Sequence, residues 1–221
     1  MPDGQYSFYL HSDDRTDIAA MATISTISQP LRGEFIRTAA TAGAVVYQVD
    51  ARLPALIPVF FAGQLSAVRL CAVMALVSGT WSSLTGLPDE PENGEAALPV
   101  SPETEYQRRR YTLTLQNGRS GERVESVLTE ASSRLRGDLL RNLIITGLAL
   151  HTTAPELPRL LASMPVPPTS VSELQALVQQ MAGTADVSRA AVPDTPATSA
   201  VPVSGSDTRE IKKNMRRAFG D

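Results

Sequence analysis

The sequence predicts a mainly α-helical fold with a short two-stranded antiparallel ribbon, formed by two copies of one unit on the same chain. The first observation is an internal repeat: residues 31–57 return as residues 135–161 at constant spacing, so that Leu53-Pro54 returns at Leu157. The second is an alternation of apolar and polar residues near the start of each copy, which indicates a strand. The third is a helical spacing of apolar residues through the rest of each copy. Each copy is therefore expected to fold as strand, helix, helix.

The two predicted strands are short, and no further strand signal lies near either of them. A lone strand cannot satisfy its own backbone donors and acceptors, so we expect the two strands to pair with each other within the chain. One face should carry the alternating apolar residues, which are Tyr6, Phe8, Leu10, Tyr111, Leu113 and Leu115. The opposite face should carry Gln5, Ser7, Tyr9, Arg110, Thr112 and Thr114.

The first helix of each copy follows its strand. In the second copy Ser120 is the expected N-cap, and the expected buried face is Val124, Val127, Leu128 and Ala131. The first copy has a weaker counterpart, for which the expected buried face is Ile18, Met21, Ala22 and Ser25. A helix is therefore expected in both copies, and its face is better defined in the second.

The second helix gives the strongest pattern in each copy. Its apolar face is Phe35, Ile36, Ala39, Ala40, Gly43, Val46 and Tyr47 in the first copy, and Leu139, Leu140, Leu143, Ile144, Gly147, Leu150 and His151 in the second. A glycine inside a helix costs about 1 kcal/mol relative to alanine. Because Gly43 and Gly147 occupy the same place in the two copies, we expect the two helices to cross closely there.

A duplicated strand, helix, helix unit is the architecture of a ribbon-helix-helix DNA-binding dimer, here with both halves on one chain as a tandem pseudo-dimer. In that architecture the ribbon enters the major groove, so its polar face is expected to contact base edges. Unpaired backbone N–H groups at the start of each second helix are expected to bind a phosphate. The residues for this role are Arg32, Ser133, Arg134 and Arg136. The alternative is a solvated sheet face, with arginines that are simply exposed at helix starts.

Composition limits the partners that are expected. The 221-residue chain has a formal net charge of −3, which argues against non-specific coating of nucleic acid. Acidic residues crowd the segment between the copies, whereas Arg108, Arg109 and Arg110 come immediately before the second strand. The single cysteine, Cys71, excludes an intramolecular disulfide, and we expect a buried side chain in a cytoplasmic protein.

Helical extensions are expected after the second helix of each copy. The apolar stretch at residues 53–87 is interrupted by Pro58, Gln64 and Arg69, so we expect one or two buried helices and no membrane span. A shorter extension is expected after Leu157 in the second copy. The start of the chain lacks the basic and apolar regions of a signal peptide.

No catalytic pattern is visible in the chain. The two histidines, His11 and His151, lie at unrelated points of the repeat. His151 stands where the first copy has Tyr47, which favours a helix-packing role. We therefore expect neither an enzyme nor a cofactor or metal site.

The expected organisation has five parts, and the last of them is a candidate docking peptide. The parts are the first copy with its extension (residues 1–86), an acidic Pro-rich linker (87–105), the second copy with its extension (106–183), a disordered linker (184–207) and a terminal peptide (208–221). The terminal peptide has apolar residues on one helical face and basic residues around the rest, so we expect it to bind a partner protein. The alternative is a frayed basic tail that contacts DNA non-specifically.

These features together resemble the ParR (also StbB) family of adaptors in plasmid segregation systems. The resemblance rests on the strand at residues 6–10, the helix at 31–50 with its Arg-Gly-Glu start, the Leu53-Pro54 exit and the tail at 211–221. It implies that the ribbon binds repeats in a centromere-like site on double-stranded DNA, and that the tail binds an actin-like ParM filament. The docking residues that it implies are Ile211, Lys212, Lys213, Met215, Arg216, Arg217 and Phe219. That family usually has one ribbon-helix-helix per chain and dimerises, whereas two copies here suggest a fused pseudo-dimer.

Two other functions fit the same sequence features. A ribbon-helix-helix transcriptional repressor would use the same ribbon and would need no tail. A scaffold subunit would use the ribbon only as an interface and would not bind DNA. The DNA sequence, the stoichiometry, self-assembly on DNA and whether the strands pair within one chain or between two stay open at this point.

Overall fold

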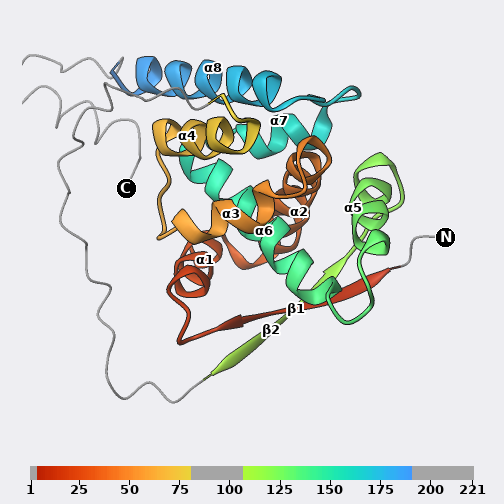
Figure 1. The fold of residues 1–221 in the computed structure, drawn as a ribbon. Helices are drawn as coiled ribbons and strands as arrows, with labels where there is room; N and C mark the ends of the chain where they lie inside the picture. The colour runs from red at the N-terminus through yellow and green to blue at the C-terminus, as the bar shows by residue number, and fades with distance from the viewer. Residues whose placement is uncertain (1–3, 81–106, 191–221) are drawn as a thin grey trace, which may run out of the picture. The chain divides into compact units, whose positions relative to one another are not determined.

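The computed structural model describes residues 4–80 and 107–190 (Figure 1). The acidic linker, all but the first residues of the expected second linker, and the terminal peptide lie outside these residues. Both copies run as one strand followed by four helices in the described part. The first copy consists of β1 (Gln5–His11), α1 (Arg15–Ser25), the 3-10 turn η1 (Gln29–Leu31), α2 (Arg32–Val49), α3 (Leu53–Phe60) and α4 (Ala67–Ser78). The second consists of β2 (Arg108–Thr114), α5 (Arg119–Glu130), α6 (Arg136–Thr153), α7 (Leu157–Ser163) and α8 (Val171–Ala190).

The two strands pair with each other, as the sequence predicts. β1 and β2 are antiparallel, with Gln5 opposite Thr114 at one end and His11 opposite Arg108 at the other. The apolar side chains of one face are buried against the helices: Phe8 and Leu10 are fully buried, and Leu113 is 1% exposed. In Figure 1 the ribbon lies along one side of the helices, and α4 and α8 lie on the opposite side. The polar face of the ribbon is thereby left toward solvent.

The second helices of the two copies, α2 and α6, cross at their matched glycines. A Cβ atom on Gly43 would overlap the backbone carbonyl group of Leu143, and one on Gly147 would overlap the backbone of Ala39. Neither position has room for any side chain, because the two backbones are in direct contact there. The close crossing expected from the repeat is confirmed, and it forms the centre of the core.

Helices α3 and α7 each pack on the second helix of the opposite copy. Helix α3 of the first copy packs on α6 of the second, and α7 of the second copy packs on α2 of the first. Thr153 of α6 also donates a hydrogen bond to the carbonyl oxygen of Leu65, at 2.7 Å. Each copy therefore covers the second helix of the other copy, α2 or α6. The two copies share one core as a result.

The helical extensions differ from the expectation in two respects. Two helices follow the second helix in both copies, but the extension of the second copy is the longer one, because α8 has 20 residues and α4 has 12. Helix α8 also passes through Gly183, where the change of composition predicts a linker, and ends at Ala190. Cys71 of α4 is buried as expected, and burial raises the pKa of its thiol. None of the described helices is both long and apolar enough to span a membrane.

Two expectations about the first helices were wrong. Ser120 is not the N-cap of α5, because the helix already begins at Arg119 and Gly118, with φ +131°, holds the cap position. In α1 the residues Ala22 and Ser25 are exposed. The buried face of that helix is formed by Asp17, Ala19, Ala20 and Ile24. A charged residue normally marks the solvent side of a helix, so the buried Asp17 made the sequence pattern point to the wrong face of α1.

Candidate nucleic-acid interface

The polar face of the ribbon brings all six predicted base-contacting residues together. The register places Gln5 opposite Thr114, Ser7 opposite Thr112 and Tyr9 opposite Arg110, so the two strands contribute equally. Gln5 and the three residues from β2 are exposed, whereas Ser7 and Tyr9 are partly covered. We refer to these six side chains as the outer face of the ribbon.

Arginines fix part of the outer face. The guanidinium of Arg110 donates two hydrogen bonds to the hydroxyl oxygen of Ser7, with Nη2 at 2.9 Å and Nε at 3.2 Å. Arg108 lies over the ring of Tyr9, with its guanidinium carbon 3.5 Å from the ring centroid. These contacts hold two cations against the sheet surface, where their remaining N–H groups can reach a ligand.

Arg108 is a seventh member of the outer face, although the sequence pattern placed it before the strand. It is the first residue of β2, and it pairs with His11 of β1. The signal was available, because Arg108, Arg110 and Thr112 are spaced by two residues and so share one side of a strand. The outer face is therefore more basic at the Tyr9 end than the sequence predicted.

The predicted phosphate-binding arginines have one structural role in common. Arg32 donates from Nε to the carbonyl oxygen of Ile27 at 2.8 Å, and Arg136 donates from Nε to that of Ala131 at 3.2 Å. Both side chains therefore bind the turn between the first and second helix of their own copy. These contacts use part of each guanidinium and fix its position beside the ribbon.

Each of these arginines lies near a tyrosine on the strand of the other copy. Burial raises the pKa of Tyr111, whereas the charges of Arg109 and Arg32 act in the lowering direction. Burial and Glu125 raise the pKa of Tyr6, whereas Arg136 lowers it. The start of α2 is thus beside β2, and the start of α6 is beside β1.

The starts of α2 and α6 are open at their first turns. Their N-cap residues are Leu31 and Leu135, and no side chain caps either helix. Ser133 and Arg134 lie exposed in the turn before α6. Uncapped N–H groups and the positive end of the helix dipole favour an anion at both places. The geometry is therefore compatible with two phosphate contacts that flank the ribbon.

A buried ionic cluster at the end of β1 was missed by the sequence reasoning. The carboxylate of Asp17 is fully buried and accepts a hydrogen bond from Nε of Arg141 at 2.7 Å. Its other oxygen accepts one from the backbone N–H of His11 at 2.9 Å, and Nδ1 of His11 lies 3.2 Å away. Nη2 of Arg141 also lies 3.3 Å from Asp14. The cluster links β1, α1 and α6, so it positions one end of the ribbon.

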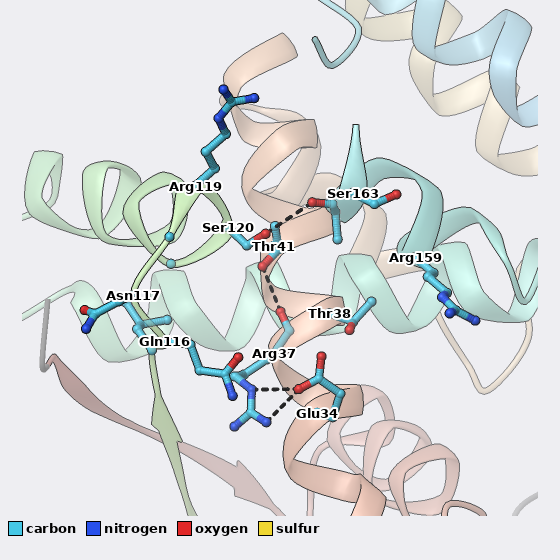
Figure 2. Close-up of a pocket in the computed structure, with 14 residues that line it drawn as sticks. Glu34, Arg37, Thr38, Thr41, Gln116, Asn117, Arg119, Ser120, Arg159 and Ser163 are labelled. Atoms are coloured by element: carbon cyan, nitrogen blue, oxygen red, sulfur yellow. Dashed lines mark hydrogen bonds and ion pairs between the residues drawn. The ribbon is translucent and has the colours of Figure 1, made fainter. Parts of the chain in front are cut away.

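A polar pocket of about 310 Å³ lies between α2, the start of α5 and α7. Figure 2 shows Arg37 at one side of it, where two hydrogen bonds of 2.7 and 3.1 Å join its guanidinium to Glu34. Arg119 and Arg159 extend away from Arg37 in this view. Among the described residues no group of three or more His, Cys, Asp or Glu side chains could hold a metal ion.

His151 and the predicted docking residues complete the comparison with the sequence. His151 packs in a helix contact as expected, with its ring edge-on to Phe35 at 5.0 Å between centroids. Its Nδ1 lies 3.1 Å from the carbonyl oxygen of Pro155. The docking residues Ile211, Lys212, Lys213, Met215, Arg216, Arg217 and Phe219 lie outside the described residues.

Comparison with known protein families gives a match that covers both copies. A family model described as plasmid stability protein matches residues 4–74 and 109–178. The two matched regions correspond to the two copies, and together they cover more than half of the chain. No curated protein and no solved structure matches the chain at a significant level.

Proposed function

The chain belongs to the family of plasmid stability proteins, and from this premise we propose that it is a sequence-specific DNA-binding adaptor of a plasmid segregation system. The ribbon binds centromere-like repeats, and the C-terminal peptide binds an actin-like filament of the ParM type. The adaptor carries out no catalysis itself, and it acts in the cytoplasm, where plasmid DNA lies.

The observation that carries the proposal is the outer face of the ribbon. A two-stranded ribbon fits the major groove of B-form DNA, and its outward side chains then meet base edges. Here one face of the ribbon is buried on the helices, while the opposite face presents hydroxyl, amide and guanidinium groups. A ribbon that served only as an interface between the copies would not need this set of donors and acceptors.

Local charge supports the proposal better than net charge does. The chain carries −3 in total, yet Arg108, Arg109 and Arg110 follow one another in β2 and are all exposed. Arg32 lies close enough to act on the pKa of Tyr111 on the same strand. A positive surface at the ribbon would attract the phosphate backbone while the rest of the chain avoids non-specific binding.

Base contact and phosphate contact can be separated by mutation. Replacing Thr112 and Thr114 with alanine should weaken binding to the specific DNA site by about 1–3 kcal/mol per lost base contact and relax sequence preference. Arg134→Ala should weaken binding to all sequences alike and reduce the salt dependence. The matched control is Arg159→Ala, an exposed arginine on α7, which should change neither property.

The measurement is fluorescence anisotropy of labelled duplexes titrated with the full chain at several salt concentrations. Duplexes from the region upstream of the protein's own coding sequence are a suitable first set. If the threonine changes leave the affinity for the best duplex unaltered, the outer face of the ribbon does not contact bases. If the full chain binds no duplex in preference to another, the protein is not a sequence-specific DNA-binding adaptor.

The filament part of the proposal rests on the sequence of the tail. Deletion of residues 208–221 should leave DNA binding nearly intact and abolish co-pelleting with the partner filament. Phe219→Ala should give most of the same loss, because one aromatic anchor can carry a large share of the affinity of a short peptide. If the deletion weakens DNA binding instead, the basic tail is a DNA-contacting arm.

A further inference from the structure

The ribbon has an approximate two-fold axis that the pairing locates. The repeat matches Tyr6 to Tyr111 and Phe8 to Leu113, and the structure places Tyr6 opposite Leu113 and Phe8 opposite Tyr111. Rotation about an axis through the centre of the ribbon therefore exchanges these two pairs. The axis passes through the pair formed by Ser7 and Thr112.

The outer face breaks this symmetry at both ends. The rotation brings Gln5 to the place of Arg110, and Tyr9 to the place of Thr114. In a homodimer these positions would carry identical side chains, because both strands would have the same sequence. In this chain one end of the face carries Tyr9 and Arg110, and the other carries Gln5 and Thr114.

The two ends of the outer face also differ in charge. Arg108 lies over Tyr9, beside Arg110, so the first end carries two cations on the outer face. The second end carries the neutral side chains of Gln5 and Thr114, and the charge of Glu125 acts on the neighbouring Tyr6. The two ends therefore offer different chemistry to the two halves of a DNA site.

We propose that the ribbon binds a non-palindromic DNA site in one orientation, with a guanine-containing half at the Arg110 end and an A·T-rich half at the Gln5 end. The inference rests on the proposed DNA-binding function and specifies the ligand of that same face. Arginine pairs with the O6 and N7 acceptors of guanine, glutamine with adenine, and the threonine methyl group packs on the thymine methyl group. The hydrogen bonds from Arg110 to Ser7 hold the guanidinium at the sheet surface before DNA arrives.

The experiment selects bound duplexes from a randomised pool with the full chain and compares two ribbons. The first ribbon is the natural one. The second carries Gln5→Arg, Ser7→Thr and Tyr9→Thr, which give both strands the same outer side chains at the three pairs from Gln5–Thr114 to Tyr9–Arg110. The natural chain should select a non-palindromic sequence, and the triple variant should select a palindrome with guanine on both sides. Replacing the guanine-containing half by a copy of the other half should weaken natural binding roughly 10-fold or more per changed base pair.

A variant with one substitution keeps the test valid if the triple variant does not fold. Tyr9 contacts Arg108, whereas Gln5 is exposed, so Gln5→Arg alone should fold normally. It should shift the selected base toward guanine at one position only. A natural chain that selects a palindrome overturns the orientation inference and leaves the DNA-binding proposal in place. A natural chain that selects no sequence overturns both.

Discussion

Arg37 and Arg141 occupy the same position in the two copies and have different partners. The side chain of Arg141 extends from α6, and its Nε donates a hydrogen bond to the buried carboxylate of Asp17 on α1, at 2.7 Å. Arg37 binds Glu34 of its own helix, and this pair lies at the side of the polar pocket. The constant spacing of the repeat puts Gly121 where the first copy has Asp17. One half thus has a buried ion pair, and the other half has a pocket at the same place.

The starts of the first helices explain how the two halves can differ. The carboxylate of Asp14 caps α1 by accepting a hydrogen bond from the backbone N–H of Asp17 at 2.9 Å. The corresponding residue at the start of α5 is Gly118, which has no side chain with which to cap. Helix α5 is held instead by the apolar residues Val124, Val127 and Leu128, all of which are buried. The backbone of the repeat is thus compatible with either an ionic or an apolar attachment of this helix.

The largest expected difference between the halves comes from the buried carboxylate. Asp17→Ala should lower the free energy of unfolding by about 3–5 kcal/mol, because it removes the main partner of Arg141 and the acceptor for the N–H of His11. Chemical denaturation followed by circular dichroism measures the change. The double variant, Asp17→Ala with Arg141→Ala, should lose less unfolding free energy than the sum of the losses in the two single variants. Strictly additive losses would show that the pair is not coupled.

The helix crossing should respond equally in the two halves. Gly43→Ala and Gly147→Ala should each lower the free energy of unfolding by about 1–3 kcal/mol, although alanine is the better helix former. The added methyl group would meet backbone of the facing helix in both cases. Gly33→Ala is the control, because it lies on α2 in an exposed position. Two very unequal losses would contradict the symmetry of the crossing.

A smaller effect of opposite sign is expected at Thr146 of α6. Its hydroxyl is fully buried and has no hydrogen-bond partner, whereas the matching position of α2 is Ala42. Thr146→Val should raise the free energy of unfolding by about 1 kcal/mol, because it removes an unsatisfied buried group at nearly constant volume. Thermal unfolding of the variant beside the natural chain measures it. A lower melting temperature would indicate that the hydroxyl has a partner.

The smallest effect belongs to the ion pair beside the pocket. Glu34→Ala should change the free energy of unfolding by no more than about 0.5 kcal/mol, since the pair joins an exposed glutamate to a partly exposed arginine three residues away on the same helix. The same denaturation experiment compares it directly with Asp17→Ala. A loss as large as that of Asp17→Ala would remove the contrast between the two halves.

The sequence predicted what repeats and left unseen what differs between the copies. Gly43 and Gly147 predict the crossing of α2 and α6, because both copies have a residue that is unfavourable in a helix at the same position of the repeat. The alternation of apolar and polar residues likewise occurs in both strands, so it predicts the ribbon and its outer face. Asp17 gave no signal, because its partner Arg141 lies 124 residues away and a lone aspartate on a helix normally faces solvent. Arg108 was misplaced by the uncertain start of a strand, which local pattern defines poorly.

The separation of the ribbon strands along the chain has a consequence for the order of folding. Ser7 and Arg110, which share two hydrogen bonds across the ribbon, are 103 residues apart. At a synthesis rate of about 5–20 residues per second, β1 waits on the order of 5–20 s for its partner. During that time its edge is unpaired, and Phe8 and Leu10 lack the cover of β2. Pairing over so long a loop is slow, so the ribbon closes late and is meanwhile open to chaperones and to strand exchange with a neighbouring nascent chain.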